Sequence, residues 1–91
     1  MKTFYVYILM CNDGTLYTGY TTSLEERLKK HNLGLASKYT RGRLPVRIVY
    51  YETFTEKHLA MQRESAIKQF SRAEKLTLIN QKSGVKSRAA E

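Results

Sequence analysis

Apolar and aromatic residues gather near the N-terminus in short runs that are typical of strands. Residues 3–10 read Thr-Phe-Tyr-Val-Tyr-Ile-Leu-Met, and aromatic and β-branched side chains favour extended structure. The following Asn12-Asp13-Gly14 is a strong turn signal. Residues 16–21 and 46–54 form two further runs of this kind. The pattern predicts a β-hairpin over residues 3–21 and a third strand over residues 46–54.

Pairs of serine and glutamate three residues apart predict the starts of two helices. Ser23 with Glu26, and Ser71 with Glu74, have the spacing of a capping box, in which each residue binds the other's backbone N–H. The first helix is expected to end near residue 32, before Gly34. A helix capped by Thr55 is expected to reach about residue 70, and the helix after Ser71 to end near residue 80.

These elements follow the order β-β-α-β-α-α. The sequence therefore predicts a compact α+β domain over residues 1–80, with a three-stranded, largely antiparallel sheet flanked by helices. Residues 33–45 are predicted to form a long basic loop. Residues 81–91 contain Gly, Ser, Lys and Arg with one large apolar residue, and we expect them to form a disordered basic tail.

The length of the hairpin loop decides which tyrosines share a face of the sheet. A two-residue loop would pair Met10 with Tyr17 and place Tyr7 and Tyr17 on opposite faces. A three-residue loop pairs Tyr7 with Gly19 and brings the two phenols to one face as diagonal neighbours. We predict the three-residue loop, because Gly14 suits the left-handed position that it requires. Gly19 opposite Tyr7 is then expected to leave open space above the sheet.

The net charge of the chain indicates a polyanionic partner. The 91 residues include 16 Lys and Arg but 8 Asp and Glu, a net charge of +8. Nucleic acid, most simply DNA, is the expected partner, with an anionic membrane surface as the second alternative and a merely soluble basic protein as the third.

The cysteine content and hydropathy predict a cytoplasmic protein. Cys11 is the single cysteine, so no internal disulfide can form, and it is expected to be a structural thiol. The N-terminal apolar run is short and mixed with Tyr and Thr, unlike a cleavable signal. No run approaches the roughly 18 apolar residues of a membrane span.

Three charged or titratable residues lie beside apolar helical stripes. On a helical wheel, Arg27 and His31 fall near Leu24 rather than with the charged face of the first helix. Arg27 either lays its stem along apolar surface or points into a cleft where it would meet a phosphate. Glu64 lies beside the stripe of the second helix. It either pairs with Lys68 or supplies the carboxylate of a magnesium site.

Together these residues resemble the GIY-YIG nuclease domain, and in particular the small stand-alone bacterial UPF0213 group. Tyr5-Val6-Tyr7 stands where the first motif is expected, and Tyr17-Thr18-Gly19 where the second is. Arg27, His31 and Glu64 follow in order, and the resemblance covers residues 3–80. The chain departs from the family pattern at Tyr5, which replaces a glycine, and at Thr18, which replaces a hydrophobic residue. Asn80 is a candidate for the asparagine that assists in several members.

The resemblance implies a metal-dependent endonuclease. Tyr7 or Tyr17 would orient or deprotonate the attacking water, Arg27 would stabilise developing charge, and His31 would share the proton transfer. Glu64 would hold one Mg²⁺ (or Mn²⁺) ion. A basic role for a phenol, whose ordinary pKa is near 10, would require Arg27 or metal-bound water to lower it.

Cations alternate with an aromatic residue in the predicted basic loop, a composition that suits phosphate contact with base stacking. The candidate nucleic-acid-binding residues are Lys38, Tyr39, Arg41 and Arg43. Two further hypotheses stay open beside the endonuclease: a nucleic-acid-binding module of the same fold with weak turnover, and an adaptor that acts through a protein partner. The sequence leaves the oligomeric state open.

Overall fold

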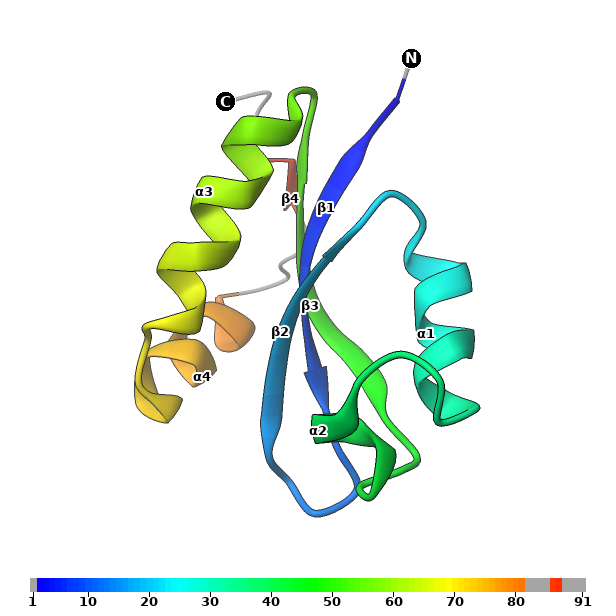
Figure 1. The fold of residues 1–91 in the computed structure, drawn as a ribbon. Coiled ribbons are helices and arrows are strands. Elements are labelled where there is room, and N and C mark those ends of the chain that lie inside the picture. The colour runs from blue at the N-terminus through cyan, green and yellow to red at the C-terminus, as the bar shows by residue number, and fades with distance from the viewer. Residues whose placement is uncertain (1, 82–85, 88–91) are drawn as a thin grey trace.

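The computed structural model describes residues 2–81 and 86–87, which form one sheet with helices on both faces (Figure 1). The sheet order is β2-β1-β3-β4. In chain order the elements are β1 (Phe4–Met10), β2 (Leu16–Thr21), α1 (Leu24–Asn32), α2 (Lys38–Arg41), β3 (Arg47–Phe54), α3 (Lys57–Lys68), α4 (Arg72–Asn80) and β4 (Lys86–Ser87). The predicted α+β class and antiparallel three-stranded sheet are confirmed by β2, β1 and β3.

Two elements were missed. The region predicted as a loop contains the one-turn helix α2, which is capped by the Ser37 side chain accepting from the Tyr39 N–H. The two-residue strand β4 pairs in parallel with β3, within the tail that was predicted to be disordered. Residues 82–85 and 88–91 of that tail lie outside the described residues, so for them disorder stays a prediction.

The hairpin has the predicted register. Tyr7 lies opposite Gly19, and Leu9 lies opposite Tyr17. The Cys11 N–H donates to the Thr15 carbonyl at 2.8 Å, which leaves the three predicted residues in the loop. Gly14 has a φ of 85°, the left-handed region that glycine enters without steric cost.

Two of the three predicted N-caps are present, and one of these two forms the complete capping box. The capping box of Ser71 and Glu74 is complete. Ser23 caps α1 by accepting from the Glu26 N–H, but its own N–H donates to the Thr21 hydroxyl rather than to Glu26. The expected Thr55 cap is wrong, because α3 begins after Glu56, which makes no side-chain cap bond.

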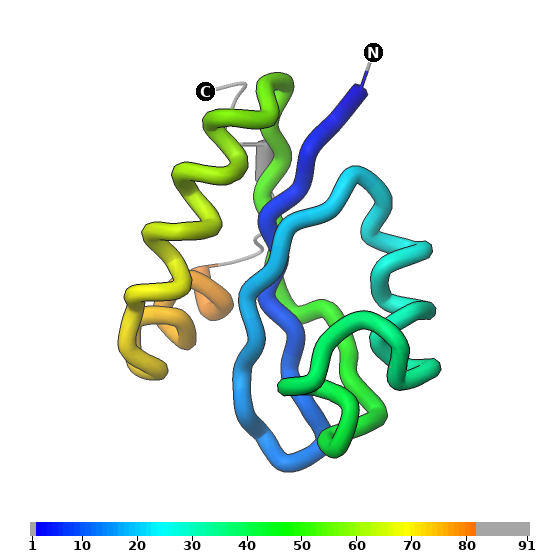
Figure 2. Tube along the Cα trace, viewed as in Figure 1, coloured from blue at the N-terminus to red at the C-terminus, as the bar shows by residue number. Residues whose placement is uncertain are grey.

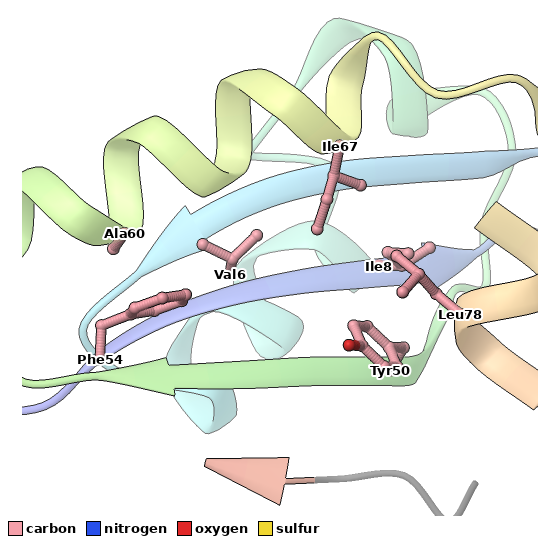
Figure 3. Close-up of a cluster of buried hydrophobic side chains, with 7 residues drawn as sticks. All are labelled: Val6, Ile8, Tyr50, Phe54, Ala60, Ile67 and Leu78. Atoms are coloured by element: carbon pink, nitrogen blue, oxygen red, sulfur yellow. The ribbon is translucent and has the colours of Figure 1, made fainter. Parts of the chain in front are cut away.

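The alternation of side chains along the strands divides the core between the two faces. Helices α3 and α4 cover a face that includes Val6 and Ile8, and Ala60 and Ile67 of α3 point toward it (Figure 3). Helices α1 and α2 cover the other face, around Tyr7, Leu9 and Cys11. The hairpin thus runs between two helical layers, with β2 at the edge of the sheet (Figure 2). Within the described residues, no helix is long and apolar enough to cross a membrane.

Thr18 of β2 is a polar residue whose side chain is buried. It is 3% exposed, and its hydroxyl has no hydrogen-bond partner within the described residues. Thr21, three residues on, is also buried, but its hydroxyl bonds both the carbonyl and the N–H of Ser23.

We expect Thr18→Val to stabilise the fold by about 1 kcal/mol, because it removes an unsatisfied buried hydroxyl while keeping the side-chain shape. Thr21→Val is the matched control and should destabilise by about 1 kcal/mol, because it breaks bonds that exist. Urea unfolding at an unchanged m-value measures both. A loss of stability in Thr18→Val would show that the hydroxyl has a partner.

Candidate active site

The phenol of Tyr7 lies directly across Gly19, on the face of the sheet that α1 and α2 cover. A Cβ added to Gly19 would collide with the Tyr7 hydroxyl and would come within 3.0 Å of its Cε1. The expected open space above Gly19 is therefore wrong, since the Tyr7 ring fills it. The glycine instead lets a buried phenol cross the edge strand with its hydroxyl held in one place.

His31 holds that hydroxyl from the neighbouring helix. The imidazole is 1% exposed, and its Nε2 lies 3.1 Å from the Tyr7 oxygen. Its Nδ1 lies 2.9 Å from the hydroxyl of Thr40. Both ring nitrogens are thus bonded, which fixes the ring between β1 and α2.

The bonds of Thr40 determine which way the protons point. We assign the hydrogen of the His31 ring to Nδ1, because the Thr40 hydroxyl can donate to the Ser37 carbonyl, at 3.4 Å, and then accepts from His31. A neutral imidazole protonated at Nδ1 has an unprotonated Nε2. The Tyr7 hydroxyl therefore donates to His31, and its oxygen lone pairs face the rest of the site.

Tyr17 completes the aromatic part of the cluster, as the hairpin register predicted. Its ring meets the His31 ring edge-on at 5.3 Å between centroids, and the Tyr7 ring does so at 6.0 Å. On its other side Tyr17 stacks with Tyr39 of α2, at 5.8 Å and 27°. The two phenols thus share one imidazole as a common neighbour.

Arg27 is the cationic member of the cluster. It lies one helical turn before His31 on α1 and is partly buried. Its charge lowers the pKa of His31 and opposes the rise in the pKa of Tyr7. Arg27 therefore lies close enough to act on both groups, and its contact with a phosphate stays a prediction.

Glu64 belongs to α3, on the face of the sheet opposite α1 (Figure 1). Its side chain is only 14% exposed, and its carboxylate lies 3.4 Å from the Lys68 ammonium group. The predicted Lys68 pair is therefore present. The carboxylate also raises the pKa of Tyr7, so Glu64 acts on the phenol cluster although its helix is on the other face. The Lys68 alternative for Glu64 is thus confirmed, and its role at a magnesium site stays a prediction.

The pKa of Tyr7 shifts in the direction opposite to the one that a phenolate base requires. Burial raises it well above its ordinary value of 10, and the neighbouring Tyr17 raises it further. Arg27 lowers it by less than these effects combined. Tyr7 is therefore a neutral phenol in the protein alone, because the lowering effect of Arg27 is smaller than the effects that raise its pKa.

The cations of the predicted basic loop differ in whether their side chains already contact other groups of the protein. Lys38 and Arg41 are exposed on α2. Arg43 lies over the Tyr39 ring at 4.4 Å and pairs with Asp13 at 3.1 Å. Lys38 and Arg41 are consequently better placed to meet a phosphate than Arg43, which ties the loop to the hairpin turn.

Sequence reasoning missed Thr40, which is fully buried and orients His31. Its only signal was its place among the cations of the predicted loop, where nothing distinguishes a buried threonine from an exposed one. Asn80 lies exposed at the C-terminal end of α4, and among the described residues no recorded contact joins it to Tyr7 or His31.

The carboxylate of Glu64 fits a Mg²⁺ ion better than a metal that needs several protein ligands. Within residues 2–81 and 86–87, no three or more His, Cys, Asp or Glu side chains gather closely enough to hold an ion. Mg²⁺ keeps several waters and takes one or two protein carboxylates along with substrate oxygens. A single, largely buried carboxylate with a partly exposed lysine partner can meet that requirement.

Comparison with known proteins gives a domain match over most of the chain. The sequence model described as the GIY-YIG catalytic domain matches residues 3–77. A UPF0213 protein of Clostridium perfringens is 56% identical over 79 residues, which cover 87% of this chain and 85% of that protein. A UPF0213 protein of Natronomonas pharaonis is 54% identical over 80 residues, 88% of this chain and 94% of that protein.

Two solution structures have the same fold. The UPF0213 protein BH0048 of Bacillus halodurans is 49% identical with a TM-score of 0.59, over 90% of this chain and 87% of that one. The protein EF2693 of E. faecalis is 39% identical with a TM-score of 0.61, over 88% and 85% of the two chains.

We expect Gly19→Ala to destabilise the protein by about 1–3 kcal/mol, because the added methyl group overpacks the site that the Tyr7 ring fills. Gly42→Ala is the matched control, since a Cβ there meets nothing within 4 Å. Urea unfolding measures the difference. Equal stabilities for Gly19→Ala and Gly42→Ala would contradict the close contact of Tyr7 with Gly19.

The buried His31 predicts a pH dependence of stability. Burial first, and Arg27 second, hold its pKa below the usual 6.5. As the pH falls below about 6.5, the unfolded chain binds a proton that the folded imidazole does not, so the free energy of unfolding decreases. This loss continues until the pH reaches the lower pKa of the folded state.

We therefore expect the free energy of unfolding to fall less steeply below pH 6.5 in His31→Gln than in the native chain. Denaturant unfolding between pH 7.5 and roughly pH 5 measures the two slopes. His58→Gln, which removes an exposed imidazole, should keep the native slope. Identical slopes in His31→Gln and the native chain would contradict a neutral, buried His31.

Proposed function

Because the chain belongs to the GIY-YIG family, we propose that it is a divalent-metal-dependent endonuclease that hydrolyses phosphodiester bonds in DNA with low intrinsic sequence specificity. One observation carries the proposal. The buried Tyr7 hydroxyl bonds His31 and is influenced by both the cation of Arg27 and the carboxylate of Glu64. A nucleophile-activating group, a cation and a metal-binding carboxylate are the parts that phosphodiester hydrolysis needs.

Tyr7 and His31 act together in the proposed proton transfer. The attacking water donates to the Tyr7 oxygen while the Tyr7 hydroxyl hydrogen passes to Nε2 of His31, so no free phenolate forms. This relay suits a phenol whose pKa is raised and an imidazole that is neutral. Thr40 keeps Nε2 as the accepting nitrogen by bonding Nδ1.

Arg27 is proposed to bind the scissile phosphate from the α1 side. A guanidinium offers several N–H donors to phosphate oxygens and keeps its charge at any working pH. A bound phosphate would also offset the effect of Arg27 on His31, because an anion beside the imidazole favours its protonated form. Substrate binding thereby makes His31 a better proton acceptor.

Glu64 is proposed to hold the metal from the α3 side. Mg²⁺ or Mn²⁺, when bound, would polarise the scissile phosphate and stabilise charge on the leaving oxygen. Lys68 would release the carboxylate for this purpose, since its side chain is 53% exposed and its ammonium group can be hydrated when the pair opens. Lys38 and Arg41 would contact neighbouring phosphates.

A binding module with weak turnover is the second candidate, and the raised pKa of Tyr7 is the observation that favours it. If the relay through His31 is inefficient, the fold would still bind nucleic acid through its basic surface. Such binding would weaken with added salt, because cations that contact phosphates release counterions.

We expect the protein to nick DNA when Mg²⁺ or Mn²⁺ is present, and Glu64→Gln and Arg27→Ala each to reduce the rate by about 10²–10³-fold. The assay uses single-stranded, duplex, branched and RNA substrates, with DNA affinity measured in parallel. Glu25→Gln and Lys29→Ala, exposed residues of α1, are the matched controls and should keep the native rate.

Three results separate the candidates. Nicking that survives Glu64→Gln unchanged would trace the activity to a contaminant and reject the site. Salt-sensitive binding without cleavage of any substrate would establish the second candidate. No binding at low salt would reject both and leave the protein-partner hypothesis.

A further inference from the structure

A concave region lies at the edge of the sheet, beyond the cluster around Tyr7. It has a volume of about 210 Å³, below the roughly 300–1,000 Å³ of sites for drug-sized ligands. Its lining comes from the start of β2, from α2, from the turn between α3 and α4, and from α4 itself. Helices α2 and α4 flank the same half of β2 in Figure 1. The lining residues are Thr15, Leu16, Tyr39, Phe70, Arg72 and Lys75.

The pocket combines apolar walls with two cations. Leu16 and the rings of Tyr39 and Phe70 supply the apolar part. Arg72 and Lys75 supply the charge, and among the described residues neither forms an ion pair with a carboxylate. Apolar walls beside cations without acidic partners suit a ligand that has an aromatic part and an anionic part.

Arg72 is held in place by the hairpin turn. One of its Nη atoms donates to the Gly14 carbonyl at 2.7 Å. A guanidinium has five N–H donors, so this bond positions the group and leaves donors for a ligand. The turn and α4 thus fix one side of the pocket.

The surroundings of Lys75 disfavour its positive charge, and a bound anion would stabilise that charge. Burial lowers its pKa, and the positive charge of Lys68 lowers it further. A phosphate at this point would offset both effects, because it replaces lost hydration with a charged partner and screens the like charge.

Two series of contacts connect the pocket with the proposed catalytic site. On the α3 side, Lys68 pairs with Glu64 and acts on Lys75. On the α2 side, Tyr39 stacks on Tyr17, which contacts His31. A strand whose scissile phosphate is bound by Arg27 and Glu64 would therefore lead toward the pocket along these contacts.

We propose that this pocket binds one unpaired nucleotide of the substrate strand next to the scissile phosphate, with the base against Phe70, beside Tyr39, and a phosphate on Arg72 and Lys75. This inference rests on the proposed function and deepens it. A base that enters the pocket leaves its stack and its pairing partner, at a cost that is lowest for a base already single-stranded. The pocket therefore selects strands with an unpaired nucleotide beside the cleavage point.

The test measures binding separately from cleavage. Binding of a single-stranded oligonucleotide and of the matching duplex is followed by fluorescence anisotropy, in the full chain carrying Glu64→Gln and without metal. Phe70→Leu and Lys75→Gln are each added, with Lys57→Gln, an exposed lysine at the other end of α3, as the matched control. Thermal unfolding of each variant checks that the fold is retained.

We expect Phe70→Leu and Lys75→Gln each to weaken single-strand binding about tenfold, and to weaken duplex binding much less. Lys75→Gln should also reduce the salt dependence of single-strand binding by about one unit of slope, while Phe70→Leu should not change that slope. Lys57→Gln should leave the preference for single strands unchanged.

Equal losses for single strand and duplex, or no loss in Lys75→Gln, would overturn the proposal. Lys75→Gln decides the outcome if Phe70→Leu fails to fold, since Phe70 also packs against the core. If the native chain never nicks DNA but these binding effects appear, the proposed enzymatic function fails and the nucleotide pocket stands. Normal nicking with unchanged binding in Lys75→Gln rejects the pocket alone.

Discussion

The structure depends on one close contact, in which the phenol of Tyr7 crosses the edge strand above Gly19. Any side chain at position 19 would displace this ring. With the ring in place, its hydroxyl meets His31 of α1, and His31 in turn meets Thr40 of α2. One missing Cβ therefore determines how the hairpin, α1 and α2 come together, and it places a buried polar chain in a region that is otherwise apolar.

The hairpin was predictable because local physics determines it. The turn signal at Asn12-Asp13-Gly14 and the left-handed Gly14 select a three-residue loop, and the register of every pair along β1 and β2 follows from it. The same reasoning found the cap at Ser71. It failed at Thr55, since α3 begins without a side-chain cap and is stabilised by packing of Ala60 and Ile67 instead.

The site was predictable only in part. Periodicity placed His31 and Glu64 beside apolar stripes, but it could not show that their helices cover opposite faces. The role of Thr40 depends on a one-turn helix too short for any periodic signal. The direction of the Tyr7 pKa shift depends on burial, which is a property of the packed molecule and not of the tyrosine or its neighbours in sequence.

Helices α1 and α3 lie on opposite faces of the sheet, and the sheet keeps the two helices apart. Arg27 and Glu64 belong to helices on opposite faces, so the sheet sets how far apart the backbones of these helices lie. Insertions or deletions in the segment between α1 and β3 would change the outer surface and the contacts of α2. They would leave the hydrogen-bonded strands between the two helices unchanged, so the outer surface can vary without altering the separation that the proposed chemistry would use.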